Sequence, residues 1–158
     1  MWLLKLLLVV LFFIILYQDY KDRLVYWFLY PLIGVLAFVI QIAFLPLDSV
    51  LFNIGINLVL VSFLLLVCYG YTKLRNLEFK NSFGIGDVLF FIFITFSFSI
   101  ISFFVLFLFS LLFSLALHFV LSKNDVNKTV PLAGYMSLFF GVVYGITFFY
   151  ESNFLYAY

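Results

Sequence analysis

Long apolar runs, separated by short clusters of charged residues, make up most of the chain. A helix of about 20 apolar residues is needed to cross a bilayer core of about 30 Å. Cutting the chain at its charged clusters predicts membrane-spanning helices over residues 2–17, 24–45, 51–71 and 130–150. The segments between them are 18–23, 46–50, 72–86 and 122–129, and the stretch from 88 to 121 remains to be divided.

The stretch from Val88 to Leu121 holds 34 residues with no Asp, Glu, Lys or Arg. One straight helix of that length would measure about 51 Å, which is too long for a single crossing. We therefore predict two spans, 88–99 and 101–121, with a turn near Ser97 to Ser102. The predicted fold is all-α: a polytopic membrane protein whose six transmembrane helices form one domain over residues 1–158.

The basic residues set the expected orientation, because cytoplasmic loops carry an excess of Lys and Arg. With six spans, seven of the 8 basic residues fall on one side, and Lys5 alone falls near the other. The seven are Lys21, Arg23, Lys73, Arg75, Lys80, Lys123 and Lys128. We expect a multi-pass protein of the plasma (inner) membrane with these residues in the cytoplasm and both termini outside.

Composition excludes several classes of protein. The chain has 158 residues, of which 68% are hydrophobic and only 9% charged, whereas a soluble domain keeps about a quarter charged. A net charge of +1 offers no basic surface for nucleic acid. The single cysteine, Cys68, excludes a disulfide framework and a cysteine-based zinc site. We expect the lipid bilayer as a partner and no metal or cofactor, and the oligomeric state stays open.

Two aspartates stand where a bundle of such helices could bring them together. Asp19 follows the first span so closely that it should continue that helix, and Asp87 opens the fourth span at the same predicted depth. An aspartic protease needs one ionised carboxylate to take a proton from water and one protonated carboxyl to polarise the scissile carbonyl. Crowding two carboxyl groups raises the pKa of one of them, so the pair titrates as a unit.

Asp87 and Asp19 each also have a purely structural explanation that competes with the catalytic one. Asp87 ends the run Ser82-Phe83-Gly84-Ile85-Gly86-Asp87, where the glycines permit unusual backbone angles and close approach of a substrate strand. Asp87 could equally cap the positive end of its helix. Asp19 and Arg23 are four residues apart and could form a helical ion pair, and Asp22 competes with Asp19 for a catalytic role.

The two aspartate motifs together resemble a known family. Asp19 is followed by Arg23 and Val25 at the end of one span, and Gly84-Ile85-Gly86-Asp87 begins another. This pattern resembles the type IV prepilin peptidases and the related archaeal preflagellin peptidases, which are membrane aspartic proteases of the GxGD type. The alignment selects Asp19 over Asp22. Val130-Pro131 is similar to an aliphatic-Pro motif that opens the family's last helix. The chain resembles the peptidase core alone, without the cysteine-rich methyltransferase part.

The resemblance implies an aspartic endopeptidase that removes leader peptides from prepilin-like precursors at the cytoplasmic membrane face. Asp19 and Asp87 would be catalytic, Gly84 and Gly86 would admit the scissile strand, and Arg23 would support the site. One alternative is a small proton-coupled transporter or channel that titrates the same aspartates. Another is a catalytically silent scaffold, suggested by Leu89 and Tyr26, which stand where the family often has Lys and Pro.

The remaining polar residues of the spans have simpler interpretations. We expect Gln41, Asn53 and Asn57 to hydrogen-bond between helices, and His118 to be an interfacial aromatic residue. The Phe-rich stretch from Phe90 to Phe113 is expected to pack between helices and against lipid.

Overall fold

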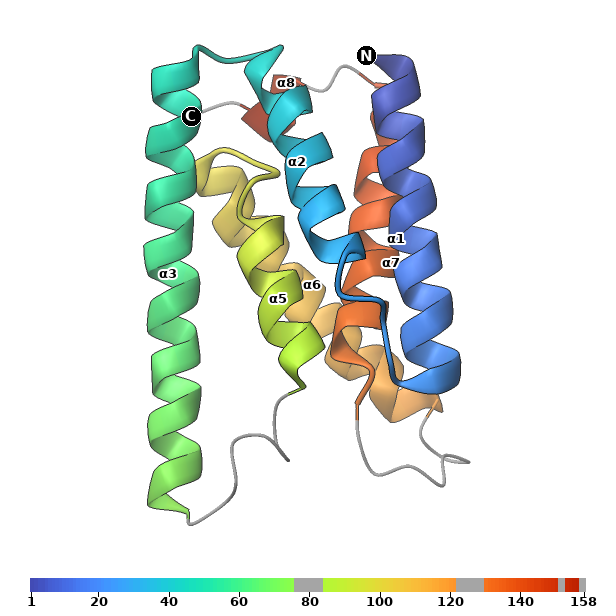
Figure 1. The fold of residues 1–158 in the computed structure, drawn as a ribbon, viewed down its shortest axis with the longest axis vertical. Helices are drawn as coiled ribbons and strands as arrows, with labels where there is room; N and C mark the ends of the chain where they lie inside the picture. The colour runs from blue at the N-terminus through green and yellow to red at the C-terminus, as the bar shows by residue number, and fades with distance from the viewer. Residues whose placement is uncertain (76–83, 122–129, 151–152, 157–158) are drawn as a thin grey trace.

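The structure is a computed structural model that describes residues 1–75, 84–121, 130–150 and 153–156. Within these ranges the regular structure is entirely helical, which confirms the predicted all-α class. The helices, in chain order, are α1 Trp2–Asp22, α2 Leu29–Ile42, α3 Leu47–Leu74, α5 Ile85–Ile94, α6 Ile100–Leu121, α7 Leu132–Ile146 and the single turn α8 Asn153–Tyr156 (Figure 1).

Three of these helices are long and apolar enough to cross a membrane: α1, α3 and α6, with 21, 28 and 22 residues. The helices α2, α5 and α7 are equally apolar in character but have only 14, 10 and 15 residues. The three long helices support a membrane protein. The part of the chain that the structure describes does not support all six predicted spans at the expected length.

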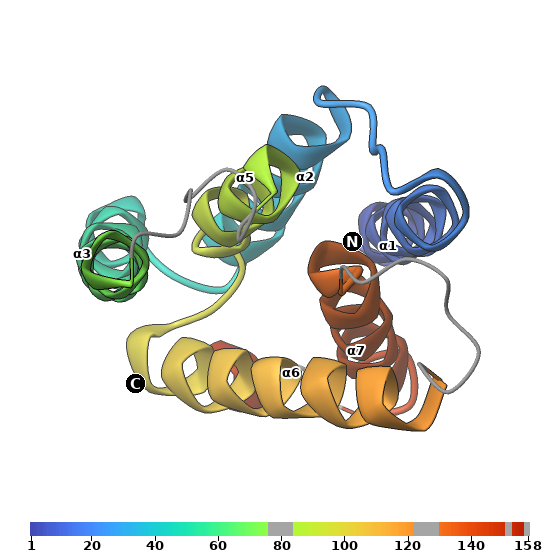
Figure 2. The same cartoon turned by 90° about the horizontal axis from the view of Figure 1, so that it is seen from below.

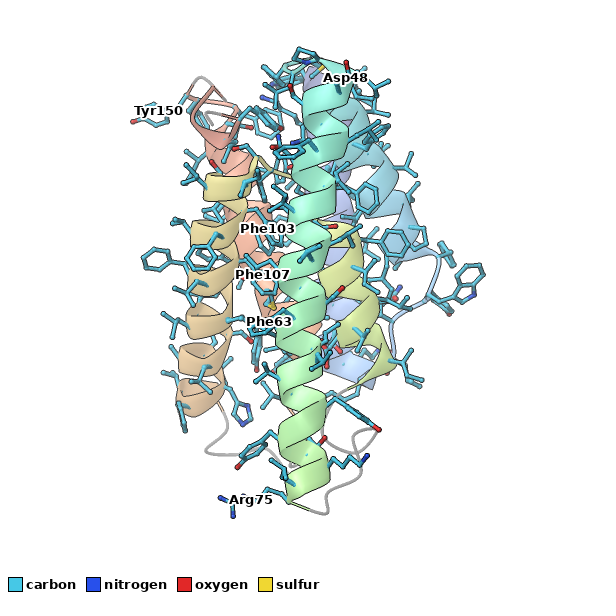
Figure 3. The ribbon with its side chains drawn as sticks, turned by 90° about the vertical axis from the view of Figure 1, so that its left-hand side faces the viewer. Asp48, Phe63, Arg75, Phe103, Phe107 and Tyr150 are labelled. Atoms are coloured by element: carbon cyan, nitrogen blue, oxygen red, sulfur yellow. The ribbon has the colours of Figure 1, made fainter. Side chains whose placement is uncertain are left out.

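The six longer helices alternate in direction, so the C-termini of three helices and the N-termini of the other three lie at one end of the bundle. At this end α1, α3 and α6 finish and α2, α5 and α7 begin (Figure 1). Seen from there, α7 lies between α1 and α6, while α3 lies at the outer edge beside α5 (Figure 2). Arg75 and Asp48 mark the two ends of α3 (Figure 3). Lys21, Arg23, Lys73 and Arg75 therefore share one end of the bundle.

The second helix begins later than predicted, at Leu29 instead of residue 24. Arg23 ends α1 with a left-handed backbone (φ 55°) that turns the chain out of the helix. The next residues are not helical, and the backbone N–H of Tyr26 donates a 3.1 Å hydrogen bond to Oε1 of Gln18. Apolar residues continue through this connection, so the hydrophobic pattern alone could not separate it from the helix.

The break between the fourth and fifth helices lies at residues 95–99, close to the predicted turn near Ser97 to Ser102. No Gly or Pro makes this turn. Asn57 of α3 holds it instead, because its Nδ2 donates to the carbonyl oxygens of Thr95 (3.1 Å) and Phe98 (3.0 Å). The hydroxyl of Tyr144 donates to the carbonyl of Ser97 at 3.2 Å. The predicted helix-to-helix role of Asn57 is thus seen in the structure.

A cluster of aromatic rings forms the centre of the bundle. Phe12 of α1, Phe90 of α5 and Phe140 of α7 lie with their ring centroids 6.2 to 6.4 Å apart and are almost completely buried. Phe98 stacks on Phe140 at 5.8 Å, which extends the cluster to the α5–α6 turn. These contacts are the expected interhelical packing of the Phe-rich stretch. They hold α1, α5 and α7 together, and each of these helices contributes to the site described next.

Candidate active site

Asp19 lies in the last turn of α1, which continues past the predicted boundary at residue 17. Its side chain is 9% exposed. Oδ2 accepts a 2.6 Å hydrogen bond from the backbone N–H of Gly134 in α7, 115 residues along the chain. Asp22, the competing candidate, is the exposed last residue of the same helix. Burial and a distant backbone donor therefore distinguish Asp19 from Asp22.

Asp87 lies in the first turn of α5, whose N-cap is Gly84. Its side chain is half-buried, and Oδ1 accepts a 2.9 Å hydrogen bond from the backbone N–H of Ala133. The carboxyl group also accepts a hydrogen bond from the backbone N–H of Gly84, the N-cap of α5, so Asp87 caps its own helix as well as contacting α7. Asp87 reaches across to a neighbouring helix, as Asp19 does.

The start of α7 brings the two aspartates together. The first N–H groups of a helix have no acceptor within the helix, and the helix dipole makes this end positive. Pro131 is the N-cap and provides no side-chain cap. The consecutive N–H groups of Ala133 and Gly134 are satisfied instead by carboxylates from α5 and α1. Asp19 and Asp87 are close enough to interact electrostatically with each other.

This arrangement gives the pair the chemistry expected of a carboxyl dyad. Backbone N–H donors stabilise an ionised carboxylate, whereas two negative charges at this separation repel each other. One proton shared between the two groups relieves the repulsion, so the pair can hold one base and one acid. Asp19 in the last turn of α1 and Asp87 in the first turn of α5 lie at the end of the bundle where α1 and α3 finish (Figure 1), which is also the end of Lys21, Arg23, Lys73 and Arg75.

The glycines of the site are needed for space and not for unusual backbone angles. No described glycine has a positive φ, and Gly84 is extended at φ −67° and ψ 142°. A Cβ on Gly86 would lie 2.6 Å from the hydroxyl oxygen of Tyr30, and one on Gly134 would lie 3.0 Å from both Cβ and Oδ2 of Asp19. The expectation of special backbone angles at Gly84 and Gly86 is therefore wrong, because the chain there follows an ordinary helix start.

Arg23 does not occupy the helical position that its spacing from Asp19 suggested. The helix ends at Asp22, and the left-handed backbone of Arg23 removes it from the regular i,i+4 geometry. Arg23 still interacts electrostatically with Asp19. What the structure shows of Arg23 near Asp19 is its charge at the end of α1.

Three contributors to the site were not predicted: Ala133, Gly134 and Tyr30. Val130-Pro131 was the only signal for the first two, since a proline that opens a helix precedes donors without acceptors. Tyr30, in the first turn of α2, is 2% exposed and places its hydroxyl against Gly86. Nothing local distinguishes it from the other ten tyrosines of the chain.

Other polar residues lie away from the dyad or outside the described residues. Gln41 is buried, but its amide atoms make no hydrogen bond within the described residues, so the expected bond between helices is not seen for it. His118 lies in the last turn of α6. Lys80, Lys123 and Lys128, on which part of the orientation argument depends, lie outside the described residues, as do Ser82 and Phe83 of the glycine motif.

No family model, curated protein or solved structure matches the chain.

Proposed function

We propose that the chain is a membrane-embedded aspartic endopeptidase of six transmembrane helices, with Asp19 and Asp87 as its catalytic pair. The observation that carries the proposal is the convergence of the two carboxyl groups on consecutive N–H groups of α7, Ala133 and Gly134. Three helices far apart in sequence contribute to this one point. An aspartate that only ended or capped its own helix would not need a second helix as its partner.

The proposed reaction is hydrolysis of a peptide bond by one water molecule. The ionised carboxylate of the pair takes a proton from water as its oxygen attacks the carbonyl carbon, and the protonated carboxyl donates its proton to the carbonyl oxygen. The tetrahedral intermediate then collapses: the carboxyl group that took the proton from water passes it to the leaving nitrogen as the C–N bond breaks. The other carboxylate takes a proton from a hydroxyl of the intermediate as the C=O bond re-forms. The products are a carboxylic acid and an amine, and the pair returns to holding one proton.

The resemblance to prepilin peptidases supports the substrate class. Such a substrate is a pilin-like precursor with a short basic leader followed by a hydrophobic helix. Its junction would lie at the membrane surface on the cytoplasmic side. The dyad lies at the end of the bundle where four of the described basic residues gather, which is the cytoplasmic end by the positive-inside rule. We propose that the short helices α2, α5 and α7 complete the crossings with their flanking residues.

The position of the dyad favours hydrolysis over ion or proton transport. A transporter is expected to hold its titrating residues near the bilayer midplane. Asp19 lies in the last turn of α1 and Asp87 in the first turn of α5, so both stand at the edge of the bundle. The scaffold alternative makes the same structural prediction as the protease and differs only in activity.

The test is co-expression with a pilin-like precursor, with loss of the leader followed by gel mobility. Asp19→Asn and Asp87→Asn should each reduce processing by at least about a hundred-fold, because each removes one general acid or base. Asp22→Asn is the matched control, since it makes the same charge change on an exposed residue of the same helix. It should process the precursor at the wild-type rate, with equal amounts of each variant in the membrane.

Processing that persists in Asp19→Asn but stops in Asp22→Asn would refute the proposed pair. A wild-type protein that cleaves no pilin-like precursor would refute the substrate class and favour the scaffold.

A further inference from the structure

A third polar side chain lies against Gly86, the residue before Asp87, and comes from a helix that carries neither aspartate. Tyr30 lies in the first turn of α2, and its ring packs edge-on against Phe90 of α5 at 6.3 Å. Its side chain is 2% exposed. A tyrosine buried in an apolar bundle normally finds a hydrogen-bond partner for its hydroxyl. The groups close to this hydroxyl therefore indicate its role.

The glycine before Asp87 fixes the position of the Tyr30 hydroxyl. The nearest atom to a Cβ built on Gly86 is Oη of Tyr30, at 2.6 Å, whereas the ring carbons Cζ and Cε2 lie at 3.6 and 3.9 Å. A real Cβ is essentially never 2.6 Å from a heavy atom of a residue that is not its chain neighbour. Of the Tyr30 atoms near this position, only the hydroxyl oxygen would therefore clash with a Cβ at residue 86.

Charge also connects Tyr30 to the dyad. Its hydroxyl interacts electrostatically with both Asp19 and Asp87. Asp19 also interacts electrostatically with the positive charge of Arg23. A phenol is neutral near pH 7 and carries one O–H donor. Beside two carboxyl groups that hold one negative charge, this donor is attracted to the ionised oxygen.

We propose that Tyr30 is a positioning residue of the dyad, whose hydroxyl donates a hydrogen bond to the ionised carboxylate, and that Gly86 is small in order to admit that hydroxyl. The inference rests on the proposed function for its catalytic consequence. It assigns Gly86 a role inside the protein, in addition to any approach of a substrate strand.

The first test is Tyr30→Phe, which removes only the hydroxyl. We expect kcat to fall about tenfold with KM unchanged, and the acidic limb of the pH–rate profile to move up by about one pH unit. A hydrogen bond to a charged acceptor is worth enough to produce such a shift. Tyr20→Phe is the control, since Tyr20 is exposed at the same end of the bundle. It should leave both the rate and the profile unchanged.

The second test couples the two positions. Gly86→Ala should impair cleavage because its methyl group displaces the Tyr30 hydroxyl. In the double variant Tyr30→Phe with Gly86→Ala the nearest ring atoms are at ordinary contact distance, so cleavage should equal that of Tyr30→Phe alone. A double variant with wild-type activity would overturn the proposal. It would show that the Tyr30 hydroxyl has no role in cleavage and that Gly86 is small only to prevent a clash with it. Wild-type kcat and pH profile in Tyr30→Phe would also overturn it.

A readout without cleavage separates this inference from the proposed function. In purified protein labelled with ¹³C-aspartate, infrared spectra follow protonation of the carboxyl groups with pH, and Asp19→Asn and Asp87→Asn assign the bands. Tyr30→Phe should move the titration of the pair by about one pH unit, again because a charged acceptor loses its donor. If the wild type cleaves nothing but this shift is found, the proposed function falls and the positioning role stands. An unchanged titration would overturn the positioning role.

Discussion

The backbone N–H of Gly134 donates a 2.6 Å hydrogen bond to Oδ2 of Asp19, across 115 residues of sequence. Ala133, the residue before it, makes the equivalent bond to Asp87. The first turn of α7 thereby replaces its missing cap with two carboxylates from other helices. The two hydrogen bonds that bring the aspartates together are the same bonds that satisfy the first N–H groups of α7. A substitution that moves the start of α7 therefore also moves the aspartates.

Gly134→Ala should disable the site without unfolding the bundle. The new methyl group would lie 3.0 Å from Cβ and Oδ2 of Asp19, so the carboxyl group must move away from its donor. We expect precursor cleavage to fall by about tenfold, since a misplacement of about 1 Å can cost a hundred-fold and this contact requires a smaller shift. The measurement is cleavage together with thermal unfolding in detergent.

Gly145→Ala is the matched control for that change, because a Cβ at this position of the same helix meets nothing within 4 Å. It should cleave as the wild type does. Equal activity of the two glycine variants would contradict the role of close contact at Gly134.

Asn57→Ala should lower the stability of the bundle. Its amide donates to the carbonyls of Thr95 and Phe98 in a turn that is buried and without Gly or Pro. Leaving these acceptors without a donor should cost about 1–3 kcal/mol. Unfolding in detergent with increasing denaturant measures the change.

Asn53→Ala serves as the comparison for Asn57, since Asn53 is only half-buried one turn earlier on α3. It should change the free energy of unfolding much less. A loss of stability that is the same for both variants would show that the turn does not depend on Asn57.

Gly34→Ala should disturb the packing of α2 on α5. A Cβ at Gly34 would lie 2.7 Å from Cδ1 of Phe93. Overpacking of this kind typically costs about 1–3 kcal/mol, and the variant should unfold at a lower temperature in detergent. Gly55→Ala on α3, where a Cβ meets nothing within 4 Å, should not. An unchanged melting temperature for Gly34→Ala would show that the Phe93 ring shifts at little cost.

The proposed orientation predicts that the two ends of α3 face opposite sides of the membrane. In a Cys68→Ala background, Asp48→Cys should react with an impermeant maleimide on intact cells, and Arg75→Cys only after the cells are permeabilised. Both residues are exposed and lie at opposite ends of the helix (Figure 3). Labelling of both from the same side would refute a crossing by α3, and the reversed pattern would refute the cytoplasmic position of the dyad.

The order and character of the helices follow from the sequence by itself. Apolar runs and charged clusters are local features, and they predict the helical class, the division of the stretch from 88 to 121, and the place of both aspartates at helix ends. The same features could not locate the start of α2, because Leu24 to Phe28 are as apolar as the helix that follows. The left-handed backbone at Arg23 and the hydrogen bond from Tyr26 to Gln18 decide that boundary.

The sequence by itself determined that Asp19 and Asp87 stand at the ends of two apolar helices, since their positions depend only on neighbouring residues. The tertiary structure alone decided that they meet at α7 and that the Tyr30 hydroxyl lies against Gly86. These contacts join residues separated by 46 to 115 positions, and they exist because Phe12, Phe90 and Phe140 pack α1, α5 and α7 into one core. Local hydrophobicity shows that a helix is buried, but only the packing of side chains determines which helices lie together.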